Sequence, residues 1–165
     1  MSVARIMNNK VHTVITAAPG ESVRTAAQRL ARHHVGALVV IDAQGTIAGM
    51  VLDGDVVRAL ADGETDTDTA IVRDIMSSCT LTCGMESSEA EIMELMSTGH
   101  VRYLPVISKG QLLGIVSLGD VVRLRMEKIR ELMTDIEQQV EAERFTANLQ
   151  RRRDADAPRA LALAS

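Results

Sequence analysis

The segment His34-Val-Gly-Ala-Leu-Val-Val-Ile41 returns 66 positions later as His100-Val-Arg-Tyr-Leu-Pro-Val-Ile107, with five of its eight residues unchanged. Further along, Gly49-Met-Val-Leu-Asp-Gly-Asp-Val-Val-Arg58 returns as Gly114-Ile-Val-Ser-Leu-Gly-Asp-Val-Val-Arg123, with seven of ten residues unchanged. This second pair is 65 positions apart, because the turn is one residue shorter in the second copy. An internal repeat of this kind indicates two copies of one structural unit of about 60 residues.

Each copy shows the same order of predicted elements. In the first copy, apolar residues at 23, 26, 27, 30 and 31 have the spacing of an amphipathic helix. It is followed by short β-rich runs at 37–41 and 46–52, which predict a hairpin, and by a helix from Gly54. The second copy predicts a helix at 89–97, strands at 103–107 and 112–116, and a helix from Gly119. A sheet this small needs a partner layer, so we expect an α+β fold in which two α/β-type repeats pack on each other.

The composition excludes several classes of function. Apolar residues make up 46% and charged residues 24%, which is typical of a globular protein. With one Tyr, one Phe and no Trp, the chain has few aromatic side chains that could stack on nucleic-acid bases. A net charge of -4 also disfavours binding to a phosphate backbone, so nucleic acid is an unfavoured partner. Residues 1–14 contain no signal-peptide core, and no apolar run is long enough to span a membrane. We therefore expect a cytoplasmic protein without a membrane partner.

Neither a metal site nor a catalytic site is predicted. Cys79 and Cys83 have no second cysteine pair or histidine at ligand spacing, so we interpret both as ordinary thiols. His33, His34 and His100 likewise have no carboxylate or cysteine at a chelating interval. The chain contains no Walker A loop, no dinucleotide-binding glycine motif and no nucleophile elbow. We expect a protein that is not an enzyme.

The two copies resemble the cystathionine β-synthase-type (CBS) domain, in the order helix, strand, turn, strand, helix. The resemblance extends over about residues 6–128 and implies a pair of β-α-β-β-α repeats related by pseudo-twofold symmetry. We place the first repeat at 6–66, the second at 73–130, a continuing helix at 119–150 and a disordered tail at 151–165. The resemblance also implies a regulatory module that binds an adenosine-containing ligand between its two copies.

The segment Ser117-Leu-Gly-Asp120 suits such a ligand on chemical grounds. It lies where a strand passes into a helix, so backbone N–H groups point towards the same space. The Ser117 hydroxyl can donate to a phosphate or ribose oxygen, and the Asp120 carboxylate can accept from a ribose diol. The alternative is that Asp120 only caps the helix, a role worth about 1 kcal/mol without any ligand.

The first copy departs from this pattern, because Leu52 replaces the serine while Asp55 remains. A weaker or empty cleft is therefore expected there. The resemblance, however, implies phosphate contacts from the residues before the Leu-Pro strand, which places Arg102 and Tyr103 at the cleft of Asp55 and leaves Gly36 and Ala37 for that of Asp120. Arg102 can bind a phosphate in bidentate fashion, or it is a solvated surface arginine.

The remaining expected ligand contacts are carried over from the resemblance alone. Four lie beside the base, chiefly through main-chain groups and apolar walls, at Thr16, Thr82, Val35 and Val101, and Pro105 is a further expected ligand-binding residue. Such contacts do not rank AMP, ADP, ATP, NADH and S-adenosylmethionine, although we favour AMP or a close analogue. No cofactor is expected to be required.

A second feature is an apolar stripe near the C-terminus, with spacings of 4, 3, 4, 3 and 4: Val122, Met126, Ile129, Met133, Ile136 and Val140. This is the heptad pattern of a helix that pairs with another helix. The stripe either packs on the first segment of the same chain or pairs across a homodimer, which we favour.

Two functions therefore remain open. In the first, the ligand changes the surface that the dimer offers to an unidentified protein target. In the second, the clefts are vestigial and the chain is a dimerisation or scaffold module.

Overall fold

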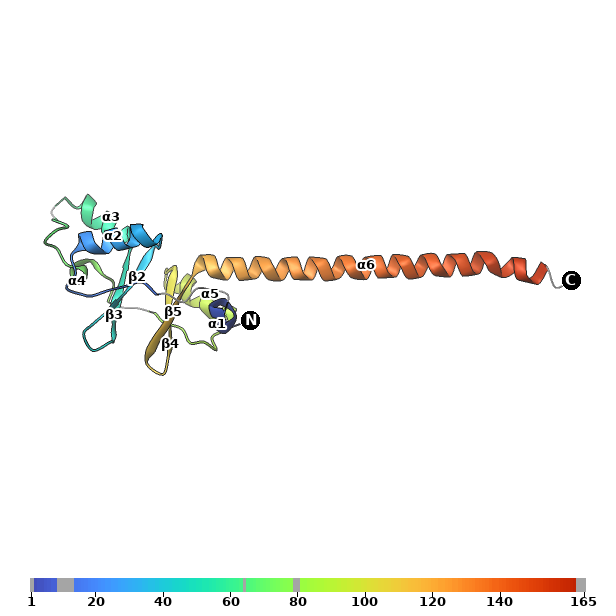
Figure 1. Cartoon of the computed structure of the whole chain (residues 1–165), viewed down its shortest axis with the longest axis horizontal. Helices are drawn as coiled ribbons and strands as arrows, with labels where there is room; N and C mark the ends of the chain where they lie inside the picture. The colour runs from blue at the N-terminus through green and yellow to red at the C-terminus, as the bar shows by residue number, and fades with distance from the viewer. Residues whose placement is uncertain (1, 9–13, 64, 79–80, 163–165) are drawn as a thin grey trace. The chain divides into compact units, whose positions relative to one another are not determined.

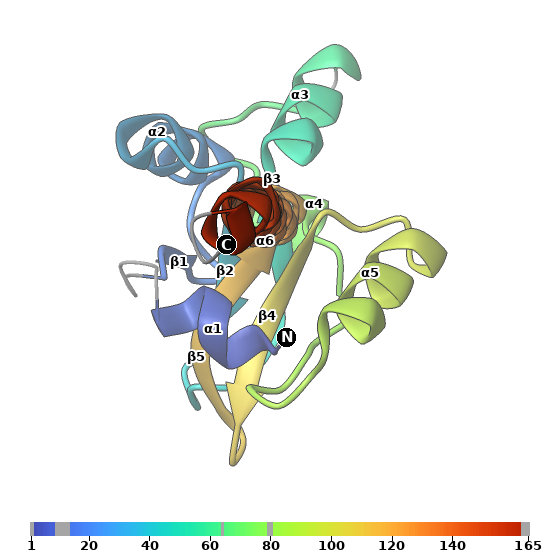
Figure 2. The same ribbon diagram turned by 90° about the vertical axis from the view of Figure 1, so that its right-hand side faces the viewer.

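The structure is a computed structural model that describes residues 2–8, 14–63, 65–78 and 81–162, with side chains described as far as residue 153. It divides into two compact units, Met1–Val121 and Val122–Ser165. Both repeats belong to the first unit, and the helices and strands are numbered in chain order, with β1 labelled in Figure 2 and the others in Figure 1.

The first repeat is a three-stranded sheet with two helices. Its elements are β1 (Thr16–Ala17), α2 (Val23–His33), β2 (Ala37–Ile41), β3 (Ile47–Leu52) and α3 (Asp53–Ala61). The strand order is β1-β2-β3, in which β1 is parallel and β3 antiparallel to β2. Helix α2 begins where the Ser22 hydroxyl oxygen accepts the N–H of Thr25 at 3.2 Å, as expected for an N-cap serine.

The second repeat has the same order of elements. It contains α5 (Glu89–Thr98), β4 (Tyr103–Ser108), β5 (Gln111–Ser117) and the first turn of α6 (Leu118–Ala162). Strands β4 and β5 form an antiparallel hairpin, and a single parallel bridge from Cys83 to Val106 stands where β1 stands in the first repeat. The chain therefore contains two copies of one mixed helix and strand unit.

The repeated histidines have a structural explanation. His34 and His100 follow α2 and α5 and adopt left-handed backbone conformations, with φ of 52° and 51°. Histidine is one of the few residues other than glycine that is enriched in this region of backbone space. The repeat of His34 at His100 therefore corresponds to a repeated helix-ending turn.

Two short helices are exchanged between the repeats. Helix α1 (Val3–Asn8), at the start of the chain, lies next to β5 of the second repeat (Figures 1 and 2), while α4 (Val72–Ile75) packs with α2 and α3 of the first. The Val3 N–H donates to the Ser87 carbonyl at 2.9 Å, and the Val72 N–H donates to the Glu21 carbonyl at 2.8 Å. Each repeat is thus completed by a segment from the other, and both repeats belong to one compact unit.

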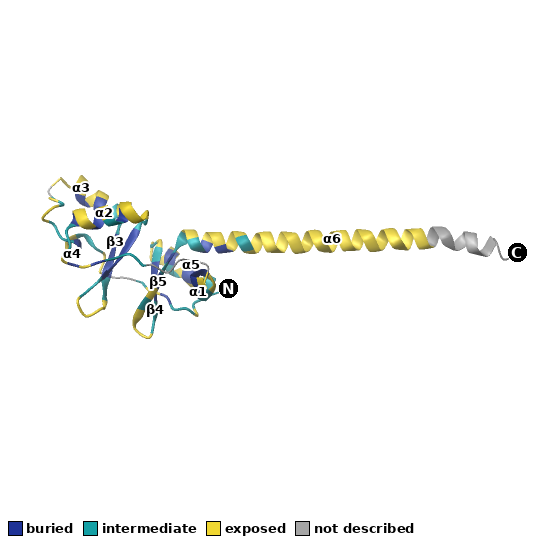
Figure 3. Ribbon diagram, in the orientation of Figure 1, coloured by how far each residue is buried: buried dark blue, intermediate teal, exposed yellow. Residues whose placement is uncertain are grey.

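The core of the first unit lies along the strands, where the buried residues gather in β2 and in the middle of β3 and β4 (Figure 3). The most deeply buried large side chains include Leu38, Val40 and Val51 of the first repeat, and Ile92 and Leu104 of the second. These are the apolar positions of the repeat pattern, so burial of its aliphatic side chains is the main stabilising contribution.

The described part of the second unit is the rest of α6. The helix continues beyond residue 150, where the sequence predicts a disordered tail, and ends at Ala162. Alanine and arginine, which are strong helix formers, make up eight of the twelve residues at 151–162 and favour the longer helix. In the described residues, no helix is both long and apolar enough to span a membrane.

Candidate functional site

A small cavity of about 50 Å³ lies between the two repeats. Residues of both repeats and of the connection between them line it: Met50, Leu52, Ser77, Leu81, Val101, Arg102 and Tyr103. Small-molecule sites usually enclose roughly 300–1,000 Å³. A nucleotide would therefore have to displace part of this wall in order to enter.

In each repeat, the start of the hairpin meets the residue that follows its second strand, and we call this place the corner of the repeat. The two corners are built alike. The Asp53 N–H donates to the Gly36 carbonyl at 3.1 Å, and the Leu118 N–H donates to the Arg102 carbonyl at 2.9 Å. Gly36 and Arg102 are thus equivalent positions, each held at the start of its hairpin by the residue after the second strand.

The two corners also meet across the repeats. The Tyr103 hydroxyl lies so close to Gly36 that a Cβ there would collide with it, and the Arg102 Nη2 atom is 3.7 Å from Asp53 Oδ1. Arg102 and Asp53 are both exposed, with 63% and 58% of their side chains accessible. The sequence identifies Arg102 and Tyr103 as site residues but not Asp53, which directly follows β3 and has an apolar counterpart in Leu118.

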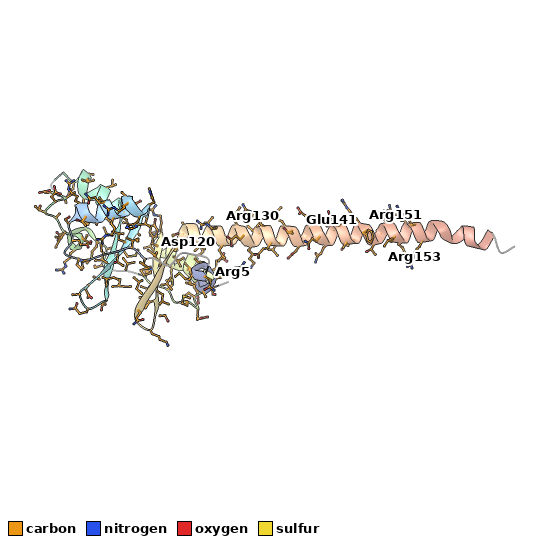
Figure 4. The ribbon with its side chains drawn as sticks, in the orientation of Figure 1. Arg5, Asp120, Arg130, Glu141, Arg151 and Arg153 are labelled. Atoms are coloured by element: carbon orange, nitrogen blue, oxygen red, sulfur yellow. The ribbon has the colours of Figure 1, made fainter. Side chains whose placement is uncertain are left out.

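Ser117 and Asp120 form a reciprocal cap at the start of α6. The Asp120 N–H donates to the Ser117 Oγ atom at 3.2 Å, and Asp120 Oδ2 accepts from the Ser117 N–H at 2.8 Å and from its hydroxyl at 2.7 Å. This is the capping box expected for a serine followed three residues later by an acid. Asp120 therefore caps α6, and Figure 4 shows it at this end of the helix. Its contact with a ligand stays a prediction.

Asp55 has the equivalent position but different partners. Its Oδ2 atom accepts the Leu52 N–H at 2.7 Å, while Oδ1 pairs with Arg58. Leu52 has no side-chain oxygen, so this cap is only half of a capping box. A ribose diol at Asp55 would have to compete with both the Leu52 amide and the Arg58 guanidinium.

The positions carried over for the base are held mainly by backbone contacts. The amides of Val35 and Val101 donate to the Leu30 and Met96 carbonyls at 3.1 and 3.0 Å, so neither N–H is available to an adenine without exchange. The Pro105 carbonyl accepts from Cys83 at 3.0 Å.

The two threonines differ in their surroundings. Thr16 begins β1, and its carbonyl accepts from Arg29, which is also paired with Glu21 at 2.9 Å. Thr82 is exposed and lies directly before the Cys83 bridge. The described contacts therefore give Thr16 a fixed main chain and leave the Thr82 side chain at the surface.

No group of three or more His, Cys, Asp or Glu side chains is arranged to hold a metal ion in the part of the chain that the structure describes. Cys83 is buried, and burial raises the pKa of its thiol to about 11. Cys79 lies outside the described residues.

Comparison with known proteins gives the same architecture. The CBS domain family matches residues 3–62 and again residues 72–127. The CBS domain-containing protein YhcV of Bacillus subtilis is 33% identical over 129 residues, which cover 76% of this chain and 90% of that protein. The crystal structure of a CBS-domain protein from Agrobacterium tumefaciens is 34% identical with a TM-score of 0.72, covering 76% of this chain and 99% of that one.

A second similar structure carries ligands. The CBS domain pair of protein MJ0100, in complex with 5′-methylthioadenosine and S-adenosyl-L-methionine, is 25% identical with a TM-score of 0.69, and the match covers 78% of this chain and 98% of that one. The fold of this chain, with a cavity between its two repeats, thus defines a tandem pair of α+β repeats. The chain belongs to the CBS domain family.

Proposed function

We propose that the chain is a non-catalytic regulatory module that binds an adenosyl ligand, with AMP or a close analogue favoured, between its two repeats. The observation that carries the proposal is the cavity to which both repeats contribute walls, with Leu52 on one side and Arg102 and Tyr103 on the other. A ligand there contacts both halves at once, so its binding energy changes how firmly they are held together.

The ligand class follows from the lining and from the related proteins. The cavity wall is mostly apolar, which suits a purine, while Arg102 offers a cation to an anionic substituent. Both ligands of the MJ0100 pair contain adenosine. Within this class AMP, ADP, ATP, NADH and S-adenosylmethionine are the candidates, and we propose that none is needed as a permanent cofactor.

The decisive experiment is a calorimetric titration with each candidate, backed by thermal shift, because a ligand that binds only the folded state raises the melting temperature. Tyr103 is the only tyrosine of the chain, so fluorotyrosine labelling gives a single ¹⁹F resonance that reports on the cavity. We expect AMP to raise the melting temperature and to shift this resonance.

A matched pair of variants separates ligand contact from helix capping. Asp120→Ala removes the predicted diol contact together with the cap on Ser117, whereas Asp74→Ala removes only a backbone cap at a corresponding position, in which the Ile71 N–H donates to Asp74 at 3.2 Å. We expect both variants to lose stability and only the Asp120 variant to lose AMP affinity. Equal AMP affinity in the two would remove Asp120 from the site.

The scaffold function is the alternative, and the half-complete cap at Leu52 favours it for the first cleft. A scaffold would show no thermal shift and no change of the ¹⁹F resonance with any of the candidate ligands.

We also propose that α6 pairs with a second copy of the chain. The six side chains of the heptad stripe are each between 41% and 58% exposed. Burying apolar side chains of this size contributes roughly 1.5–3 kcal/mol each, so a partner helix would stabilise the exposed stripe. In this proposal a cytoplasmic dimer presents its ligand-dependent surface to a target protein.

A further inference from the structure

The two corners that meet at the cavity carry opposite charges. Arg102, from the second repeat, lines the cavity, and its Nη2 atom is 3.7 Å from the carboxylate of Asp53, from the first. In the pseudo-equivalent corner the arginine is replaced by Gly36 and the aspartate by Leu118. The ion pair is therefore a feature of one corner only. It brings a carboxylate next to the arginine that we propose as the contact for an anionic group of the ligand.

Asp53 is held in this place by its own backbone. Its N–H donates to the Gly36 carbonyl at 3.1 Å, and its Oδ1 atom accepts from the Gly54 N–H at 2.8 Å. The carboxylate also faces the place where a Cβ on Gly36 would lie, at 3.5 Å from Oδ2, beside the Tyr103 hydroxyl. The negative charge thus lies beside Arg102 and Tyr103, two residues of the cavity wall.

The pair itself is weak, because both side chains are exposed to water and their charged atoms are 3.7 Å apart. A phosphate carries more charge than a carboxylate and can accept two hydrogen bonds from the guanidinium, which the 3.7 Å contact with Asp53 does not provide, so it forms a stronger partner for Arg102. Arg102 can therefore exchange Asp53 for a ligand phosphate, but Asp53 stays next to it and repels any further negative charge.

We propose that Asp53 is a specificity-determining residue, which competes with the ligand for Arg102 and makes this cleft favour a nucleoside monophosphate over a nucleoside triphosphate. The proposal rests on the adenosyl ligand proposed above. One phosphate is matched by Arg102, whereas each further phosphate adds charge beside the Asp53 carboxylate.

The test compares the affinities of adenosine, AMP and ATP for the full chain and for three variants. Asp53→Asn removes the charge and keeps an acceptor for the Gly54 N–H, and Asp53→Leu introduces the residue of the equivalent corner. Glu86→Gln makes the same change of charge at an exposed residue of the loop beside α1. Removing one nearby charge should tighten ATP binding by about 3- to 10-fold, with a smaller gain for AMP and none for adenosine. Glu86→Gln should change none of the three.

The proposal is overturned if the ratio of the ATP and AMP affinities is the same in the parent chain and in both Asp53 variants, or if adenosine gains as much as ATP. If adenosine and AMP bind to no variant although all keep the parental circular dichroism, the adenosyl function itself has failed, and the role of Asp53 fails with it. Binding with an unchanged ratio, by contrast, rejects only Asp53.

Discussion

The hydroxyl of Tyr103, in the second repeat, lies directly against the backbone of Gly36, in the first. A Cβ at residue 36 would collide with this hydroxyl and would stand 3.2 Å from the ring carbon that carries it. Gly36 is therefore needed for a close approach between the repeats rather than for a special backbone angle.

Gly36→Ala should destabilise the pair by about 1–3 kcal/mol, the usual cost of forcing extra volume into a packed contact. Most of the clash is with the hydroxyl, so Tyr103→Phe should recover part of this loss when the two changes are combined. The measurement is the free energy of unfolding in urea for both single variants and the double variant.

Gly20→Ala is the control for this series, because a Cβ at Gly20 meets nothing within 4 Å. It should be neutral or slightly stabilising, since alanine restricts the unfolded chain. A Gly36→Ala variant as stable as the Gly20→Ala variant would contradict the close contact with Tyr103.

The exchanged helices give a second prediction at two equivalent glycines, one in each hairpin. A Cβ at Gly114 would strike the flexible end of the Met7 side chain, whereas a Cβ at Gly49 would strike the Ser77 carbonyl oxygen. That carbonyl accepts the Met50 N–H at 3.0 Å and cannot move without breaking this bond.

We therefore expect Gly49→Ala to cost about 1–3 kcal/mol of unfolding free energy and Gly114→Ala less than about 1 kcal/mol. The two substitutions are chemically identical and occupy the same place in their repeats, so each serves as the control of the other. An equal or larger loss at Gly114 would mean that Met7 does not have the freedom assumed for it.

The sequence predicts the hairpins and their flanking helices well, because each is a local pattern that occurs twice. The residue pattern alone does not predict the two-residue strand β1, which is too short to show alternation; a leading strand in each repeat follows only from the family resemblance. The exchange of α1 and α4 is also missed, although Val3, Ile6 and Met7 recur with the same spacing at Val72, Ile75 and Met76. Which repeat such a segment packs on depends on the path of the connecting chain, and local patterns do not contain that information.

The candidate site was predictable to a smaller extent. Arg102 and Tyr103 follow from the repeat register and the family resemblance, and both line the cavity. Asp53 does not, because its approach to Arg102 depends on how two side chains from different repeats are directed. The repeat register does indicate that the two corners differ in charge, since Asp53 is replaced by Leu118.

Cys83 should be unreactive in the folded chain. Burial raises the pKa of its thiol to about 11, against about 8.5 for an exposed cysteine, so the reactive thiolate is scarce at pH 8. In a Cys79→Ser variant, which leaves Cys83 as the only cysteine, reaction with a disulfide reagent should be at least about 100-fold slower than in urea.

The same shift gives a pH dependence. Because the folded pKa lies above the unfolded one, the stabilising effect of the neutral thiol is complete below about pH 8.5 and is lost as the pH rises towards 11. Cys83→Ala should remove this part of the pH dependence. In the labelling experiment on the Cys79→Ser variant, a rapid reaction of Cys83 at pH 8 without denaturant would show that the thiol is not enclosed.

The stripe on α6 predicts a dimer that one substitution weakens. Ile136 lies on the stripe and is 58% exposed, whereas Phe145 is 67% exposed but lies nine residues further on, about 180° around the helix. Ile136→Asp should raise the dimer dissociation constant at least about tenfold, since one buried apolar side chain contributes roughly 1.5–3 kcal/mol. Phe145→Asp, the matched control, should leave it unchanged. Sedimentation equilibrium distinguishes the outcomes: equal weakening by both substitutions would place the contact elsewhere on the helix, and a monomeric parent chain would reject helix pairing between copies.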